Sequence, residues 1–257
     1  MSLTQSQVEQ AADLLLQAYS SGQQIEQLPD ALTPQSKQDA YAIQAIVAKA
    51  RCSQPISTWK VGAPNLDTEP YAAPIFQSVV SDSPTKIPAS SLHMIGIEVE
   101  LAYRFNQDLP QREQPYSADE VAAAIEGVYV VVEVVDTRLK TWETCAEMWK
   151  LADNQINAAL IVGNGTQDWR TLDPAKLAGE LIVDGKVLVR GEGAHSVGDP
   201  MHLVNWTANH LTGRNGGLKQ GDLVTTGTWT GMVFVEPGAE VVGRFEGVGE
   251  ARVSFPV

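Results

Sequence analysis

Apolar and polar positions alternate with a helical period over the first fifty residues. Five apolar residues recur at steps of three and four before the first glycine of the chain: Val8, Ala11, Ala12, Leu15 and Tyr19. A second set follows Thr33-Pro34 and consists of Tyr41, Ile43, Ile46 and Val47. Because such spacing gathers apolar side chains on one face, the sequence predicts two amphipathic helices. The proline-bearing stretch from about 52 to 92 predicts a connection that could cover a site.

From residue 95 the period falls to two, as in IGIEVELAYRF, which is typical of a strand with two unlike faces. Seven further segments are strand candidates: 128–135, 158–162, 181–189, 222–226, 232–235, 239–245 and 251–255. One substantial helix is expected at 200–211, and a shorter one follows the capping-box signature of Ser117 and Glu120. We therefore expect an α+β fold that is mostly β, with a small helical N-terminal portion and connection at 1–90 and a β body at 91–257.

Composition narrows the class of protein. The 257 residues carry 18 basic and 31 acidic side chains, a formal net charge of −13. This argues against a nucleic-acid-binding protein, which needs a basic surface. Two cysteines, Cys52 and Cys145, are too few for a disulfide framework or a four-cysteine zinc site. No apolar run approaches the ~20 residues of a membrane span, and the chain does not start like a signal peptide, so we expect a cytoplasmic protein that does not bind membranes.

Common catalytic signatures are absent from the sequence, which contains no GxSxG, HExxH or P-loop, and no GxGxxG between a strand and a helix. The four histidines are His93, His195, His202 and His210. Their spacing is not that of metal ligands, and we expect each to be a surface or capping residue. Carboxylates are the better candidates for chemistry.

Three glutamates stand in strand-like segments. Glu98 and Glu100 lie two residues apart in GIEVEL and so project from one face of a strand, where alternation alone would expose them to water. Glu133 interrupts the apolar run VVVEVV, where an unpaired carboxylate is costly. It must be protonated, ion-paired with Arg138 or Lys60, or bound to a cation. Three carboxylates on neighbouring strands would suit Mg²⁺ or Mn²⁺, which prefer oxygen ligands.

Other segments have both a structural and a functional interpretation. Lys60, in TWKVG, is either a surface lysine or a cation that holds a substrate carboxylate or relays a proton. The glycine- and threonine-rich stretch 221–231 can offer N–H groups and hydroxyls to an anion. Asp153 and Asn154 can simply form a turn or a cap.

Five motifs occur in a characteristic order: WKVG, GIEVEL, VVVEVVDTR, LADN and GDLVTTGTWTG. In these the chain resembles the fumarylacetoacetate hydrolase superfamily, in the branch of 2-oxopent-4-enoate hydratases and 4-oxalocrotonate decarboxylases, over nearly its whole length. The resemblance implies a mixed β-roll or distorted barrel that holds a divalent metal. It matches the metal ligands to Glu98, Glu100 and Glu133, the active-site lysine to Lys60, and the substrate-binding residues to Asp153, Asn154 and Thr228.

The resemblance also implies a homo-oligomer and small 2-oxo or 2-hydroxydienoate substrates from the degradation of aromatic compounds. The expected activity is Mg²⁺- or Mn²⁺-dependent hydration, such as 2-hydroxypenta-2,4-dienoate to 4-hydroxy-2-oxopentanoate, through an enolate that the metal stabilises. The alternatives are decarboxylation of the 4-oxalocrotonate type, acylpyruvate-type C–C hydrolysis, and non-catalytic binding of 2-oxo acids. Hydrolases of the superfamily usually carry a lid histidine, and residues 53–92 contain none.

The chain departs from the family pattern at three places. Ala63-Pro64-Asn65 replaces a Leu-Thr-Ser-like segment, Pro70-Tyr71 stands where an Asp-aromatic pair is usual, and Gln155-Ile156-Asn157 replaces small serines. We therefore expect different contacts to the far end of the substrate, and the family's acid or base at the Asp position to be missing.

Overall fold

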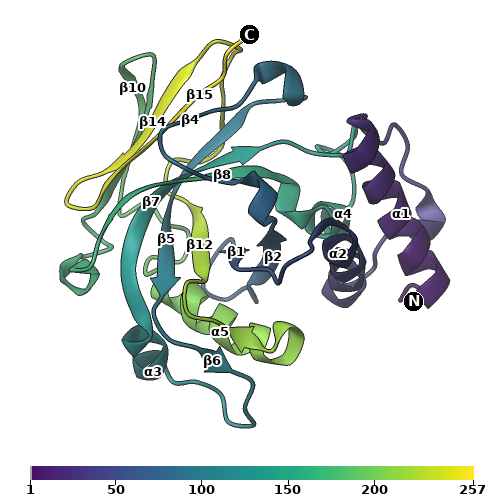
Figure 1. The fold of residues 1–257 in the computed structure, drawn as a ribbon, viewed down its shortest axis with the longest axis horizontal. Coiled ribbons are helices and arrows are strands. Elements are labelled where there is room, and N and C mark those ends of the chain that lie inside the picture. The colour runs from purple at the N-terminus through teal and green to yellow at the C-terminus, as the bar shows by residue number, and fades with distance from the viewer. Residues whose placement is uncertain (1) are drawn as a thin grey trace.

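The computed structural model describes residues 2–257, and two helices open this part of the chain, as the sequence predicts. α1 (Gln5–Ser21) begins at a capping box and ends at Gly22, whose φ of 67° is a left-handed conformation that glycine adopts readily. α2 (Lys37–Arg51) packs against α1 and against α4 (Glu147–Ala152), and the three lie together at one side of the molecule (Figure 1). Their apolar faces form a small core of their own.

Eight strands form one sheet in the order β2-β1-β12-β5-β7-β8-β3, with β13 paired to one end of β5. They are β1 (Thr58–Gly62), β2 (Tyr71–Ile75), β3 (Val80–Asp82), β5 (Gly96–Phe105), β7 (Ile125–Val135), β8 (Asn157–Thr166), β12 (Leu223–Thr228) and β13 (Val233–Phe234). The sheet is strongly curled, as the bend of β5 and β7 in Figure 1 shows. The curl brings β2 into contact with β8, although β1, β12, β5 and β7 lie between these two strands in the order of the sheet.

A second sheet has the order β10-β9-β14-β15-β4. Its strands are β4 (Thr85–Lys86), β9 (Ala178–Val183), β10 (Lys186–Glu192), β14 (Glu240–Phe245) and β15 (Gly249–Ser254). It packs on the convex side of the first sheet so closely that a Cβ at Gly243 would lie 2.8 Å from Val99 and 3.0 Å from Val132. Because side chains alternate along a strand, the neighbours of these two valines on β5 and β7 project from the concave face.

Four smaller elements pack together at one end of the molecule (Figure 1). They are α3 (Ala118–Ala123), α5 (Met201–Asn215), β6 (Leu109–Pro110) and β11 (Gly217–Leu218). The helix expected at 200–211 is thus confirmed and runs four residues further, to a left-handed Gly216. No helix within residues 2–257 has the length and apolar character that a bilayer crossing requires. The α+β, mostly β fold class is confirmed.

The interpretation of 52–92 as a connection is wrong. This segment supplies β1, β2 and β3 to the first sheet and β4 to the second, so sheet pairing crosses residue 90. The strands escaped the pattern because they are short and because Pro74 lies inside β2. A proline is tolerated there because β2 is an edge strand.

The single strand expected at 181–189 is also wrong. This stretch is a hairpin in which β9 turns into β10 at Asp184 and Gly185, with φ values of 49° and 76°. Two consecutive left-handed residues are the mark of a type I′ turn, which Asp-Gly favours. The Asp184-Gly185 dipeptide was the signal in the sequence that could have predicted this turn.

Candidate active site

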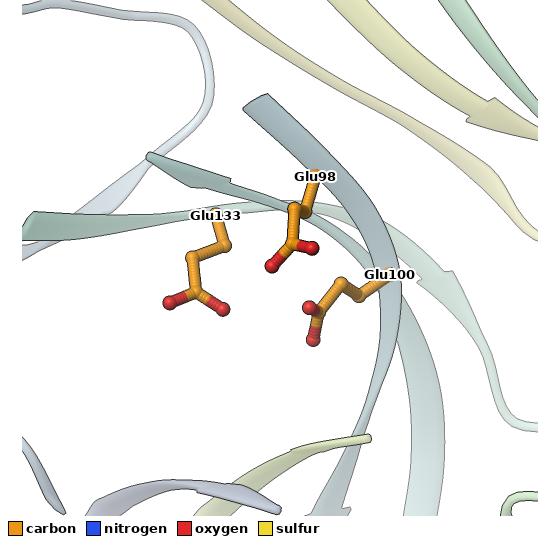
Figure 2. Close-up of side chains that lie close together, drawn as sticks. All are labelled: Glu98, Glu100 and Glu133. Carbon is orange, nitrogen blue, oxygen red and sulfur yellow. The ribbon is translucent and has the colours of Figure 1, made fainter. Parts of the chain in front are cut away.

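Three glutamates converge on the concave face of the first sheet. Glu98 on β5 stands directly opposite Glu133 on β7 in the antiparallel register, and Glu100 follows two residues along on the same face. One carboxylate oxygen of each lies within 4.8 Å of the others, and Figure 2 shows the three side chains pointing toward one another. Glu100 and Glu133 are fully buried and Glu98 is largely so. The expectation from alternation alone, that Glu98 and Glu100 face water, is therefore wrong.

Neighbouring strands fix two of these carboxylates through one oxygen each. Glu100 Oε2 accepts the hydroxyl hydrogen of Thr225 and, at 2.9 Å, the N–H of Gly227. Glu133 Oε1 accepts from the side-chain amide of Asn157 at 2.9 Å. The other oxygens, Glu100 Oε1 and Glu133 Oε2, are buried and have no hydrogen-bond partner within residues 2–257. Such oxygens fit a hard divalent cation, which takes carboxylate ligands.

The electrostatics of the cluster point the same way. Burial and the charge of Glu133 raise the pKa of Glu98 to about 7. Burial and the charges of Glu133 and Glu98 raise the pKa of Glu100 well above its usual range. Three buried carboxylates repel one another, and a cation among them would relieve that repulsion.

Lys60 reaches this cluster across the concave face. It lies on β1, which is separated from β7 by β12 and β5, a distance of about 14 Å in a flat sheet. The curl closes that distance, and the ammonium donates to Glu133 and, at 3.2 Å, to the carbonyl oxygen of Gln155. Burial lowers the pKa of Lys60, but the three glutamates outweigh it and raise the pKa, so the side chain is cationic at neutral pH. The surface-lysine interpretation is wrong, because Lys60 is buried.

Asp153 is engaged by the β7–α4 connection. Its Oδ1 accepts from Arg138 Nε at 2.5 Å, and its Oδ2 accepts from the Thr137 hydroxyl at 2.8 Å. Arg138, considered as a partner for Glu133, instead pairs with Asp153 and also donates to the carbonyl oxygen of Asn157 at 2.8 Å. Both oxygens of the Asp153 carboxylate are thus held by the protein.

The turn that follows is strained. Asn154, Gln155 and Ile156 all have left-handed φ values, of 51°, 53° and 54°. This conformation costs about 1–3 kcal/mol for a residue other than glycine and persists where the surroundings impose it. Here it directs the Gln155 carbonyl toward Lys60, while Asn154 Oδ1 is buried and without a hydrogen-bond partner among the described residues.

Arg138→Met should therefore destabilise the protein, because it leaves the buried Asp153 carboxylate without its cation. We expect the free energy of unfolding to fall by about 3–5 kcal/mol, seen as a lower urea midpoint. Combining it with Asp153→Asn, which removes the unpaired charge, should restore part of the loss. An unchanged midpoint for Arg138→Met would show that the pair does not support the turn.

The threonine-rich loop after β12 is braced by its own contacts. Thr228 stands opposite Glu100 in the register, and its hydroxyl donates to the Gly231 carbonyl at 3.2 Å and accepts the Thr230 N–H at 3.1 Å. Within the stretch 221–231, only Thr228 was expected by name to act in the site, but it is Thr225 and Gly227 that contact Glu100 directly. The TTGT run was the signal for them in the sequence. The sequence did not show how β12 pairs with β5, and this pairing decides which carboxylate they contact.

His195 differs from the expectation of a surface or capping residue. It is buried, and its Nε2 donates to the carbonyl oxygen of Thr226 at 2.7 Å, next to the residues that hold Glu100. Its ring also packs against Trp229, with centroids 5.5 Å apart. The expectation was wrong because these partners come from a distant part of the sequence.

Comparisons with known proteins agree with this arrangement. The fumarylacetoacetate (FAA) hydrolase C-terminal family model matches residues 38–255. The 2-keto-4-pentenoate hydratase of Paraburkholderia xenovorans (strain LB400) is 30% identical over 262 residues, which cover 98% of this chain and 96% of the relative. The 4-oxalocrotonate decarboxylase of Pseudomonas putida is 29% identical over 136 residues, 53% of this chain and 51% of that protein.

A solved structure shows the same fold. The 4-oxalocrotonate decarboxylase from Pseudomonas putida G7, complexed with magnesium and adipate, superposes with a TM-score of 0.86 at 24% identity and covers 99% of both chains. The family model spans most of this chain, and the hydratase matches it over nearly its whole length. The chain therefore belongs to the fumarylacetoacetate hydrolase family.

Proposed function

We propose that this protein is a divalent-metal-dependent hydratase of small 2-hydroxydienoic and 2-oxo-enoic acids, in the degradation of aromatic compounds. The observation that carries the proposal is the buried group of Glu98, Glu100 and Glu133, which leaves two carboxylate oxygens unpartnered beside a buried lysine. The full-length similarity to 2-keto-4-pentenoate hydratases supports hydration as the reaction.

In this proposal the three glutamates hold Mg²⁺ or Mn²⁺, and the solved relative with magnesium supports the choice of a divalent ion. When bound, the ion polarises the 2-oxo group of the substrate and stabilises enolate character. The ammonium of Lys60 compensates the third carboxylate, so an anionic substrate does not meet net repulsion. It also lies where it can bind the substrate carboxylate or move a proton.

Other residues keep the site in shape. Thr225 and Gly227 fix one oxygen of Glu100, and the Asp153–Arg138 pair holds the turn whose carbonyl accepts from Lys60. In the proposal Asp153 acts on the substrate through that turn, and Thr228 and Asn154 contact the substrate; the buried, unpartnered Oδ1 of Asn154 supports this for Asn154. Burial of the glutamates excludes water and strengthens every electrostatic contact within the site.

A second candidate is decarboxylation of a 2-oxo acid of the 4-oxalocrotonate type. It is favoured by the 29% identity to 4-oxalocrotonate decarboxylase over half of the chain. Both reactions use the same enolate, so the glutamates and Lys60 do not separate them.

One assay distinguishes these activities. The purified protein, with Mg²⁺ or Mn²⁺, is given 2-hydroxypenta-2,4-dienoate or 4-oxalocrotonate, and the products are followed by NMR. We expect 4-hydroxy-2-oxopentanoate from the first substrate and loss of turnover with EDTA. Release of CO₂ from 4-oxalocrotonate alone would favour the decarboxylase, and binding of both acids without turnover would contradict an enzyme.

We also propose that the protein forms a homo-oligomer. Val187 and Leu188 on β10 and Phe234 on β13 are large apolar side chains exposed on the single chain, and an interface would cover such residues. Sedimentation velocity at micromolar concentration should show a multiple of the 27.7 kDa chain mass. A species of the chain mass alone would exclude this proposal.

A further inference from the structure

Tyr71 occupies the concave face beside Lys60, at the place where the family pattern would put an Asp-aromatic pair. In the pairing of β1 with β2, Tyr71 stands opposite Gly62 and Ala73 stands opposite Lys60. Residues two apart on a strand share a face, so Tyr71 projects from the same side as Lys60 and the glutamates. The sequence lacks the aspartate of that pair, and the structure places the phenol of Tyr71 on this face.

The position of this phenol is set by a glycine. A Cβ at Gly62 would lie 2.7 Å from the Tyr71 hydroxyl oxygen and 3.0 Å from its Cζ, so the ring lies over residue 62, where any larger side chain would stand. Gly62 is two residues from Lys60, about 7 Å along the strand. The hydroxyl therefore lies near the ammonium but is displaced from it along the sheet. This displacement is comparable to the length of a five-carbon acid whose carboxylate is bound at Lys60.

The Tyr71 hydroxyl is also free to act. No hydrogen bond from it or to it is formed within residues 2–257, whereas Thr225, Asn157 and Thr228 already use their polar groups in contacts within the protein. Tyr71 is partly exposed. Burial, together with the nearby glutamates, raises the pKa of Tyr71 against the opposing charge of Lys60, which keeps the phenol protonated at neutral pH.

We infer that Tyr71 is a catalytic residue that donates the proton taken up by the terminal carbon of the dienol. This inference rests on the proposed hydratase function. The Tyr71 O–H bond breaks as the C5–H bond forms, the C2 oxygen gives its proton to water and becomes the 2-oxo group, and the remaining double bond moves to C3–C4. The phenolate then regains a proton from water, and no net oxidation or reduction occurs.

Tyr71→Phe keeps the ring over Gly62 and removes only the hydroxyl. We expect kcat for 2-hydroxypenta-2,4-dienoate to fall by about 10²–10³-fold, with KM within threefold of the wild-type value and Mn²⁺ binding unchanged. In D₂O the incorporation of deuterium at C5 should slow by the same factor. Tyr116→Phe is the matched control, because that hydroxyl donates to the Pro110 carbonyl in another part of the fold.

Gly62→Ala provides a second variant that retains the hydroxyl but displaces it. It should lower kcat in the wild-type background and have a much smaller effect in the Tyr71→Phe background, because the same group is then already lost. If the kcat losses of the two single variants multiply in full in the double variant, the inference is contradicted. A Tyr71→Phe variant that changes KM alone, or keeps kcat within threefold, would also contradict it. A wild-type protein that does not hydrate the dienoate would overturn the proposed function itself, and the inference with it.

Discussion

Replacing Glu100 with glutamine should abolish both divalent-metal binding and turnover. Glu100 Oε2 accepts from both Thr225 and Gly227, so the carbonyl oxygen of a glutamine must take that place. The amide NH₂ then occupies the position of Oε1, the buried oxygen without a partner, and presents hydrogens where the site needs a ligand. We expect kcat/KM to fall by at least about 10³-fold, in keeping with the several kcal/mol that a catalytic metal supplies.

Binding of Mn²⁺, measured by electron paramagnetic resonance or calorimetry, separates loss of the metal from loss of chemistry. Glu236→Gln is a suitable control because Glu236 is exposed and carries the same change of charge. A Glu100→Gln protein that binds Mn²⁺ as tightly as the wild type would remove Glu100 from the metal site.

Lys60→Met should impair turnover while leaving the metal in place. Methionine keeps most of the apolar stem but removes the charge that balances the third carboxylate. An anionic 2-oxo acid would then meet net repulsion, and a group suited to proton transfer would be lost, so we expect kcat/KM to fall by about 10²–10⁴-fold. Mn²⁺ affinity should be retained, because the ligand oxygens remain.

Lys86→Met, an exposed lysine on β4, is the control for the Lys60 variant. Full kcat/KM in Lys60→Met would mean that the buried ammonium only balances charge in the fold. Weaker Mn²⁺ binding together with loss of activity would instead assign Lys60 to holding the glutamates in position.

Local patterns in the sequence account for much of the fold. The three- and four-residue spacing of Val8 to Tyr19 predicts α1, and the alternation around Glu98 correctly places Glu98 and Glu100 on one face of β5. Alternation does not show what that face meets. Because the sheet curls, this face of β5 lies opposite the strands near the edge of the same sheet, such as β1. The curl depends on pairings such as β1 with β12, which join residues far apart in the chain.

The contacts of the site depend on the same long-range register. Glu133 was a recognisable anomaly because a charge interrupts an apolar run, but its choice of Lys60 over Arg138 follows from how β1 lies across from β7. Asn157 carries no local signal and Thr225 only that of the threonine-rich run around it, since each matters through the carboxylate that it faces. Tyr71 looked like a departure from a motif until its pairing with Gly62 was known.

A crystal structure of the protein with Mn²⁺ and oxalate tests the central claim most directly. Oxalate resembles the carboxylate and 2-oxo oxygens of the substrate, and Mn²⁺ gives an anomalous signal that identifies the ion. We expect one strong anomalous peak coordinated by Glu98, Glu100 and Glu133, with oxalate on the ion and the Lys60 ammonium within hydrogen-bonding distance of it. A peak elsewhere, or no ion among the three glutamates at saturating Mn²⁺, would contradict the account.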